Sequence, residues 1–312
     1  MDTATVARFE ASRNRLACLA YRLLGSAADA EDTVQDAFLR WQAADRDHIE
    51  VPEAWLTKIV TNLALDRLRS AKLRHERAVG AWMPEPLLDG DPMLGPADTV
   101  EQRESVTLAV LTLMERLSPV QRAVYVLHEA FSYSHAEIAE ILGITESASQ
   151  QHIHRARRRI AAARNGIGID QTSARRIVEA FIDAASSGRT EQLVALLTAD
   201  ATGVSDGAGG SAEKLIRYLN PEQIAAAVRA GLKPSAAKRR LAGGTPSIHA
   251  GVVNGCPAML FTIDDRILGV TILEMRDDKI AAIRGIAAPA RIARLTAQWQ
   301  RQEHDAPLVE SW

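Results

Sequence analysis

The chain has 312 residues and a formal net charge of -2, and 47% of its residues are hydrophobic against 24% that are charged. This composition predicts two or three globular domains and excludes a largely disordered chain. Apolar runs of the roughly 18 residues that span a bilayer are missing, and the first residues lack the pattern of a signal peptide. The two cysteines, Cys18 and Cys256, have no spacing typical of a metal site or a disulfide framework. We therefore expect a cytoplasmic protein with no membrane span, no metal and no other cofactor.

Charge is distributed in blocks along the chain. Residues 26–53 hold eight acidic and two basic residues, a net charge of -6. Residues 85–104 hold six acidic residues and one basic residue, a net charge of -5. Residues 55–77 hold six basic and two acidic residues and residues 143–164 hold five and one, a balance of +4 in each case. Local field decides where phosphates bind. The two basic blocks therefore predict two nucleic-acid contacts, and the acidic blocks predict a different kind of surface.

Three helices are expected in the first 80 residues. Apolar residues recur at helical spacing over 6–24 and again over 28–42, where they leave an acidic face. A third helix is expected from about residue 53 to residue 77, with a basic far end. Trp55 shares helical spacing with Ile59, so we expect Trp55 in the core and not stacked on a base.

A linker and a second helical unit follow. Residues 82–98 contain four prolines and two glycines, which predicts a linker without helix or strand. Capping patterns at 118–121 (Ser-Pro-Val-Gln) and 134–137 (Ser-His-Ala-Glu) each predict a helix start. Gly143 ends the second of these helices, and Thr145 caps a further helix with a basic second half. A short helix, a glycine turn and a second helix form a helix-turn-helix pattern.

The helix that begins after Thr145 is the expected DNA reader. Its N-terminal half would enter the major groove, where glutamine can pair with adenine and serine with several bases. Its arginines would bind phosphates, which fixes position without specifying sequence. The alternative interpretation is a charged helix end that merely suits the helix dipole. The candidate base readers are Ser147, Ser149, Gln150, Gln151 and His152, and the candidate phosphate binders are Arg155, Arg157, Arg158 and Arg159.

The pattern changes from about residue 170. Helices are expected over 172–197 and 211–230, with a glycine-rich loop between them. Asp277-Asp278 predicts a hairpin turn. Helices followed by antiparallel strands predict an α+β domain over 170–300, with residues 301–312 as a tail. The expected strands are 237–242, 246–253, 257–263, 267–276 and 279–286.

Four strings together resemble the extracytoplasmic-function (ECF) group of sigma-70-type sigma factors. They are "GSAADAEDTVQDAFLRWQ", "EAWLTKIVTNLALDRLRS", "LSPVQRAVYVLHEAFSYSHAEIAEILGITESAS" and "HRARRRI". The first two match region 2 and the last two match region 4, over about residues 5–80 and 105–162. The resemblance implies a region 2 helical bundle over 1–80, a linker over 81–100 and a region 4 helix-turn-helix domain over 101–165.

The resemblance also implies partners. The acidic helix over 28–42 would dock on the β′ clamp helices of core RNA polymerase, and region 4 would dock on the β flap. Promoter DNA would be read at the minus-10 and minus-35 elements. Melting of the minus-10 element needs polar side chains that capture an unstacked base beside a basic track. This sequence departs from many family members, which carry a basic residue at the positions of Gln150 and His152. The implied polymerase contacts are Asp32, Gln35, Asp36 and Arg40, and the implied minus-10 contacts are Asn62, Arg69, Lys72 and Arg74. The implied minus-35 contacts are Ser147, Ser149, Gln150, Gln151, His152, Arg155 and Arg158.

The last 140 or so residues resemble the SnoaL-like (NTF2-like) extension of one ECF subgroup. The similar strings are "WMPEP" at 82–86, "SDGAGG" at 205–210 and "IAAPARI" at 286–292, although the lysine of the family's glycine loop is absent. The resemblance implies that this domain acts on regions 2 and 4 in cis, as a separate anti-sigma factor would. The implied interdomain residues are Trp82, Met83, Pro84, Asp206, Pro289 and Arg291.

Two other functions stay open at this point. A polymerase-independent activator with a domain that senses a small molecule would share the helix-turn-helix and the α+β domain. An enzyme would need an acid and a base in an apolar cup, and its candidates are Asp206, His249, Asp264 and Asp265. Asp206 lies in a glycine loop and the two other aspartates resemble turn residues, so we expect no catalysis.

Overall fold

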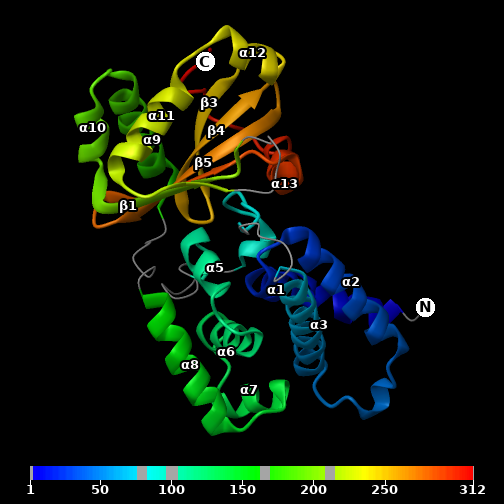
Figure 1. Cartoon of the computed structure of the whole chain (residues 1–312). Helices are drawn as coiled ribbons and strands as arrows, with labels where there is room; N and C mark the ends of the chain where they lie inside the picture. Colours follow the sequence, from blue (N-terminus) through cyan, green and yellow to red (C-terminus); the bar gives the residue numbers. More distant parts are fainter. Residues whose placement is uncertain (1–2, 76–82, 96–104, 162–168, 208–214, 312) are drawn as a thin grey trace. The chain divides into compact units, whose positions relative to one another are not determined.

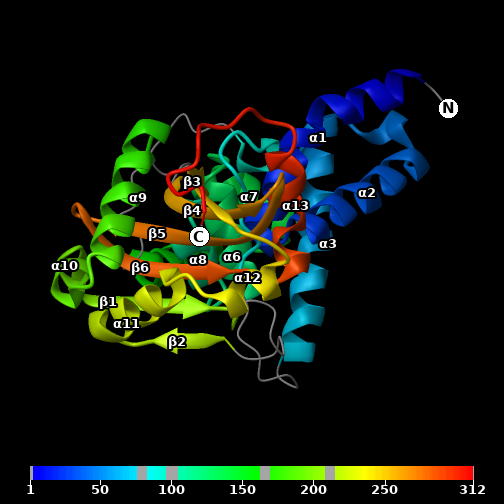
Figure 2. The same ribbon diagram turned by 90° about the horizontal axis from the view of Figure 1, so that it is seen from above.

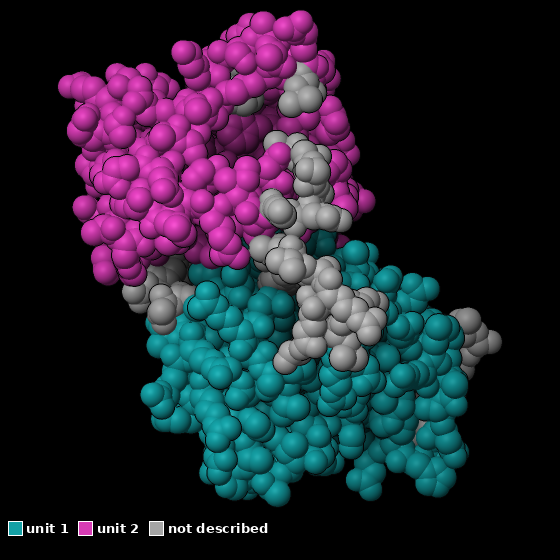
Figure 3. All heavy atoms as spheres, in the orientation of Figure 1, with its two compact units in different colours: residues 1–85, 90–164 teal, residues 86–89, 165–312 magenta. Residues whose placement is uncertain are grey.

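The computed structural model describes residues 3–75, 83–95, 105–161, 169–207 and 215–311. The chain forms two compact units, shown in Figures 1 and 3. Unit 1 contains residues 1–85 and 90–164, and unit 2 contains residues 86–89 and 165–312. The two predicted N-terminal domains thus pack into one unit, and four linker residues belong to the other.

The first part of unit 1 is a bundle of three helices. They are α1 (Thr3–Leu24), α2 (Ala27–Ala43) and α3 (Pro52–His75), with the short 3-10 helix η1 (Arg46–His48) before α3. Gly25, at φ +69°, ends α1, and the Ser26 side chain accepts from the Asp29 amide to start α2. Trp55 is half-buried and packs on the buried Trp41 ring at 5.6 Å between centroids, so it lies at the edge of the expected core. The predicted helices are therefore confirmed.

The second part of unit 1 contains the predicted helix-turn-helix. Its helices are α5 (Leu108–Met114), α6 (Pro119–Glu129), α7 (His135–Leu142) and α8 (Glu146–Ile160). Both predicted capping boxes form, at Ser118 with Gln121 and at Ser134 with Glu137. Gly143 adopts the left-handed conformation at φ +65° and ends α7, and Thr145 caps α8.

The linker is more ordered than its prolines and glycines predict. Pro92–Leu94 form the 3-10 helix η2, capped by Asp91, and Leu88 forms an isolated bridge with Val253. The prediction of a segment without helix or strand is wrong here, because apolar linker residues find buried positions on both sides of the glycines. Those buried side chains are Met83, Leu87, Leu88, Met93 and Leu94.

Unit 2 is a six-stranded sheet with helices, seen from two directions in Figures 1 and 2. The strand order is β2-β1-β6-β5-β4-β3, in which β1 and β6 run parallel and the other neighbours are antiparallel. One face of the sheet packs on α9 and α11 around Phe181 and Ile224. Helix α13 packs on β5. The strands are β1 (Leu197–Ser205), β2 (Ile216–Tyr218), β3 (Ser247–Val253), β4 (Cys256–Ile263), β5 (Arg266–Arg276) and β6 (Lys279–Ile286), and the helices are α9 (Gln171–Ser186), α10 (Thr190–Ala195), α11 (Pro221–Leu232), α12 (Ala236–Ala242) and α13 (Pro289–Trp299).

The α+β fold is confirmed, and three local predictions need correction. Residues 237–242, expected as a strand, lie in α12, where Ser235 caps the first turn and Gly243 the last. Strand β1 was not expected, and residues 216–218 of a predicted helix form β2. The expected tail pairs with the sheet, since the Ile248 amide donates to the Val309 carbonyl at 2.9 Å. Pairing of this kind depends on distant segments and leaves no local pattern.

Candidate nucleic-acid and partner interfaces

Helix α8 presents most of the predicted base readers to solvent. Its inner face consists of Ile153, Ala156 and Ile160, which are all buried. Opposite this face the exposed readers follow each other along the first turns, and His152 is half-buried at their edge, where burial and then Arg155 lower its pKa. The exposed readers are Ser147, Gln150 and Gln151.

Ser149 does not belong with the exposed readers. Its side chain is fully buried, and its hydroxyl lies 2.9 Å from His135 Nδ1 at the start of α7. Burial and the neighbouring His128 lower the pKa of His135. The sequence contains the signal for this position, because Ser149 precedes Ile153 by four residues and so lies on the apolar stripe of α8.

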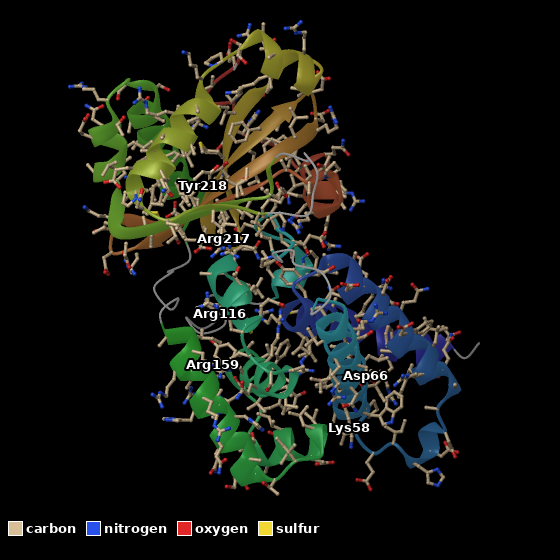
Figure 4. The ribbon with its side chains drawn as sticks, viewed as in Figure 1. Lys58, Asp66, Arg116, Arg159, Arg217 and Tyr218 are labelled. Atoms are coloured by element: carbon tan, nitrogen blue, oxygen red, sulfur yellow. The ribbon has the colours of Figure 1, made fainter. Side chains whose placement is uncertain are left out.

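The arginine block of α8 divides into two pairs. Arg157 Nε and Nη2 donate to Oε1 of the buried Glu129 at 2.9 and 2.6 Å. Arg159 Nη1 donates to the Arg116 carbonyl at 3.1 Å, and both residues are labelled in Figure 4. Arg155 and Arg158 are exposed and make no ion pair with the described residues. Within the described residues, Arg157 and Arg159 thus bond to residues of unit 1, whereas Arg155 and Arg158 point to solvent.

Helix α3 carries the predicted minus-10 residues. Asn62 is half-buried, and Arg69 is exposed with an ion pair to Asp66 at 3.1 Å. The side chains of Lys72 and Arg74 lie outside the described residues. Asp66 appears in Figure 4. The structure therefore places the polar Asn62 and the basic Arg69 two turns apart on one helix.

Helix α2 exposes a mixed, partly acidic surface. Asp32, Gln35 and Arg40 are exposed and Asp36 is half-buried, so the four predicted contacts lie on one side of the helix. Leu39 lies among them with 55% of its surface exposed, a feature that the sequence analysis missed. A single exposed leucine is common on protein surfaces and does not by itself assign a partner to this face. We name these five residues the α2 surface.

Arg67 of α3 reaches the acidic side of α2. Its Nη2 donates to Asp36 Oδ2 at 2.8 Å, and its Nη1 lies 3.7 Å from Asp29 and 3.9 Å from Asp32. This arginine partly neutralises the acidic block and fixes α2 against α3. It was not predicted, because the contact joins residues more than 30 positions apart.

Glu85 ties the linker to unit 1. Its Oε2 accepts from the Ala27 amide at 2.7 Å, at the buried N-terminus of α2. The Tyr21 hydroxyl donates to the Glu85 carbonyl at 2.8 Å, and the Glu85 amide donates to the Gly25 carbonyl at 2.8 Å. Met83 and Pro84 before it are buried, and Trp82 lies outside the described residues.

Residues 86–89 join unit 2 through Asn254. The Leu87 amide donates to Asn254 Oδ1 and the Asn254 amide donates to the Leu87 carbonyl, both at 2.9 Å. The Asp89 amide donates to the Val252 carbonyl at 2.9 Å. Asn254 can do this because it sits at φ +50° in the two-residue Asn-Gly turn between β3 and β4. We name this arrangement the linker clasp.

Three predicted interdomain residues meet inside unit 2. The Asp206 carboxylate accepts from the Ala287 and Ala288 amides at 2.9 Å each, just before Pro289 opens α13. Arg291 Nη1 lies 3.5 Å from Asp206 Oδ2. The buried Asp206 therefore holds the end of β1 against the start of α13, which is a role within the domain.

The candidate acid and base residues of an enzyme do not converge. Asp206 is bound as described, and His249 on β3 packs edge-on against Trp299 with its Nδ1 3.2 Å from the Asp305 carbonyl. Burial lowers the pKa of His249. Asp264 and Asp265 form the turn between β4 and β5. Within the described ranges these four residues therefore make no acid–base pair.

Two properties of the described residues bear on partners. Every helix in that part of the chain is too short or too polar to cross a membrane. Among the same residues, His, Cys, Asp and Glu side chains do not gather in threes as a metal site would require.

The chain matches two protein-family models and several known proteins. The models are "Sigma-70 region 2" over residues 8–74 and "Sigma-70, region 4" over residues 107–160. The ECF RNA polymerase sigma factor SigJ of Mycobacterium tuberculosis is 35% identical over 91% of this chain and 92% of its own length. The probable ECF sigma factor SigI of the same organism is 32% identical over 94% and 96%. The crystal structure of M. tuberculosis SigJ aligns with a TM-score of 0.67 at 31% identity, over 93% of this chain and 98% of that one.

Proposed function

Because the chain belongs to the ECF sigma factors with a SnoaL-like C-terminal domain, we propose that it binds core RNA polymerase and directs it to promoters through two DNA contacts. The observation that carries this proposal is the division of labour on the helices of unit 1. Unit 1 carries an exposed, partly acidic surface on α2 and an exposed face of polar and basic side chains on α8. A polymerase-independent activator would not need the first of these.

Region 4 reads the minus-35 element in this proposal. Gln150 and Gln151 contact base edges, with Ser147 and His152 at the margins of the contact. Arg155 and Arg158 bind phosphates on either side and set the register of α8 in the groove. Two free arginines provide a modest electrostatic contribution, so stable promoter binding depends on polymerase.

Region 2 binds polymerase and the minus-10 element. The α2 surface docks on the β′ clamp helices, with Leu39 as an apolar contact among polar residues, and region 4 docks on the β flap. On α3, Asn62 captures an unstacked base while Arg69, Lys72 and Arg74 follow the backbone.

A transcription assay with charge reversal on α2 tests the polymerase contact. Asp32 is exposed and lies 3.9 Å from Arg67, whose hydrogen bond at 2.8 Å is made to Asp36 instead. The Asp32→Arg variant should therefore keep the fold and lose at least tenfold of polymerase-dependent initiation. Glu222→Arg, an equally exposed reversal on α11, serves as the control. Initiation that is unaffected in Asp32→Arg would contradict docking through α2, and operator binding that needs no polymerase would favour the activator.

The C-terminal domain regulates the sigma regions in cis through the linker clasp. Support comes from the path of the linker: Glu85 is bound in unit 1, the next four residues are bound in unit 2, and Met93 and Leu94 are buried again beside α1. Such a short passage leaves little slack. Release or binding of residues 86–89 at Asn254 therefore changes the position of Glu85, which bonds to the N-terminus of α2.

The Asn254→Ala variant tests the clasp. It removes a side-chain acceptor and places alanine in a left-handed conformation, so the Leu87 and Asp89 amides should exchange at least tenfold faster with solvent. Transcription should change by more than twofold. Asp264→Ala is the matched control, since Asp264 has the same φ of 50° in another hairpin turn of the sheet. Faster exchange with unchanged transcription would show that the clasp does not regulate.

A further inference from the structure

Regions 2 and 4 are packed together in unit 1, and one surface on α1 and α3 receives a loop of region 4. The loop is residues 131–133, between α6 and α7, and it carries two half-buried aromatic rings. Helix α3 contacts both α6 and α7, and α1 contacts α6. We propose that Arg15 latches this loop onto region 2 and so holds the protein in a closed form that cannot engage a promoter.

Arg15 joins the two regions through hydrogen bonds and ring contacts. Its Nη2 donates to the Tyr133 hydroxyl at 2.7 Å, and its Nη1 donates to Thr57 Oγ1 of α3 at 3.1 Å. The Thr57 and Tyr133 oxygens lie 3.2 Å apart and close the triangle. The guanidinium also lies over the rings of Phe131 and Tyr133, at 5.3 and 5.5 Å from their centroids.

A second arginine supports the same loop from beneath. Arg22 is almost fully buried, its Nε donates to Ser105 Oγ at 3.0 Å, and its guanidinium lies 5.7 Å from the Phe131 ring centroid. Burial lowers the pKa of Arg22. The loop therefore contacts one buried and one exposed arginine of α1. Because Arg15 is exposed, water can replace its hydrogen bonds to Tyr133 and Thr57.

The face of α3 under region 4 is not a typical core face. Thr57 and Thr61 lie one turn apart and are fully buried, and the Thr61 hydroxyl has no hydrogen-bond partner among the described residues. A buried hydroxyl without a partner costs free energy, which a permanent core would avoid. Asn62, the proposed minus-10 contact, follows directly. These features indicate a face that is covered in one state and exposed in another.

Geometry requires the two regions to separate, given the proposed function on which this inference rests. The minus-10 and minus-35 elements lie about 25 base pairs apart, or about 85 Å at ~3.4 Å per base pair. A compact body of about 160 residues has a diameter of about 40 Å. With α3 packed against α6 and α7, the two DNA-reading helices cannot reach both elements. Closure therefore competes with promoter engagement.

Arg15→Ala and Tyr133→Phe test the latch in the full-length protein. Arg13→Ala is the matched control, because Arg13 is an exposed arginine of the same helix and donates to Glu10 on that helix. Spin labels at Ala7→Cys on α1 and His154→Cys on α8 report the separation of the regions, since both positions are exposed and the native Cys18 and Cys256 are buried. We expect the population beyond about 40 Å to rise about threefold to tenfold in Arg15→Ala, and less in Tyr133→Phe.

Polymerase-dependent binding to promoter DNA provides the second readout. If closure lowers the competent fraction, the apparent affinity of Arg15→Ala should rise by the same threefold to tenfold. Distances and affinities that match those of Arg13→Ala would overturn the latch, as would a weaker affinity, which would make Arg15 a contact to polymerase or DNA. A wild-type protein that supports no initiation would instead refute the proposed function, and the distance measurement would still decide the latch.

Discussion

Helices α2 and α8 both bury an apolar stripe and turn charge outward, but they use that charge differently. On α8 two of four arginines, Arg157 and Arg159, are bound to residues of unit 1, and the other two stay free. On α2 the acidic residues stay accessible, and a single arginine of α3, Arg67, crosses to them. The difference shows that the position of a charged residue around the helix decides whether its side chain bonds within unit 1 or points to solvent.

The largest effect is expected when Glu129 of α6, the buried acceptor of Arg157 on α8, is removed. Glu129 is buried with its side chain 3% exposed, so Glu129→Ala leaves Arg157 without its acceptor. We expect the free energy of unfolding to fall by about 2 kcal/mol, measured by urea denaturation. The exposed Glu140→Ala on α7 is the control, and equal losses in both variants would show that Arg157 is not anchored as described.

A smaller effect separates the outward glutamines from the inward serine. Gln151→Ala should reduce discrimination between promoter bases by about 1 kcal/mol, with little change in stability. Ser149→Ala should do the reverse and cost about 1 kcal/mol of stability, because its buried hydroxyl contacts His135. Holoenzyme binding to a set of minus-35 variants measures the first quantity. A loss of discrimination in Ser149→Ala would place that residue among the readers after all.

The two pairs of arginines on α8 should also differ in their response to salt. Arg158→Ala should lower the slope of log affinity against log salt by about 1, because one phosphate contact is lost. Arg159→Ala should leave the slope unchanged, since its guanidinium is bound to the Arg116 carbonyl. Fluorescence anisotropy with holoenzyme and promoter DNA measures both. Equal slopes in the two variants would erase the division proposed for this helix.

The smallest effect is expected from pH. The folded state lowers the pKa of His135, mainly through burial, so the folded protein binds this proton more weakly than the unfolded chain does. Its contribution to stability is therefore complete above the unfolded value of about 6.5 and is lost as pH falls below it. His135→Gln should flatten the fall in stability between about pH 7 and pH 5. The exposed His154→Gln is the control, and identical curves would contradict the prediction.

Much of unit 1 could be predicted from the sequence because its signals are local. The caps at Ser118, Ser134 and Thr145 and the left-handed Gly143 each depend on residues within one or two turns. The family resemblance rests on the same local strings. In unit 2 the helices 172–197 and the strands from 246 onward were predicted for this reason, whereas 237–242 was misassigned because its capping serine and glycine were overlooked.

The tertiary structure alone decided how the polar residues are used. Three contacts join residues that are tens to more than a hundred positions apart in the sequence. They are Arg157 with Glu129, Arg67 with Asp36, and Leu87 with Asn254. No local period encodes such pairs, because they form only after the apolar stripes have packed. The sequence by itself thus determined the helices, the helix-turn-helix and the α+β class, and packing determined which side chains remain free for DNA and polymerase.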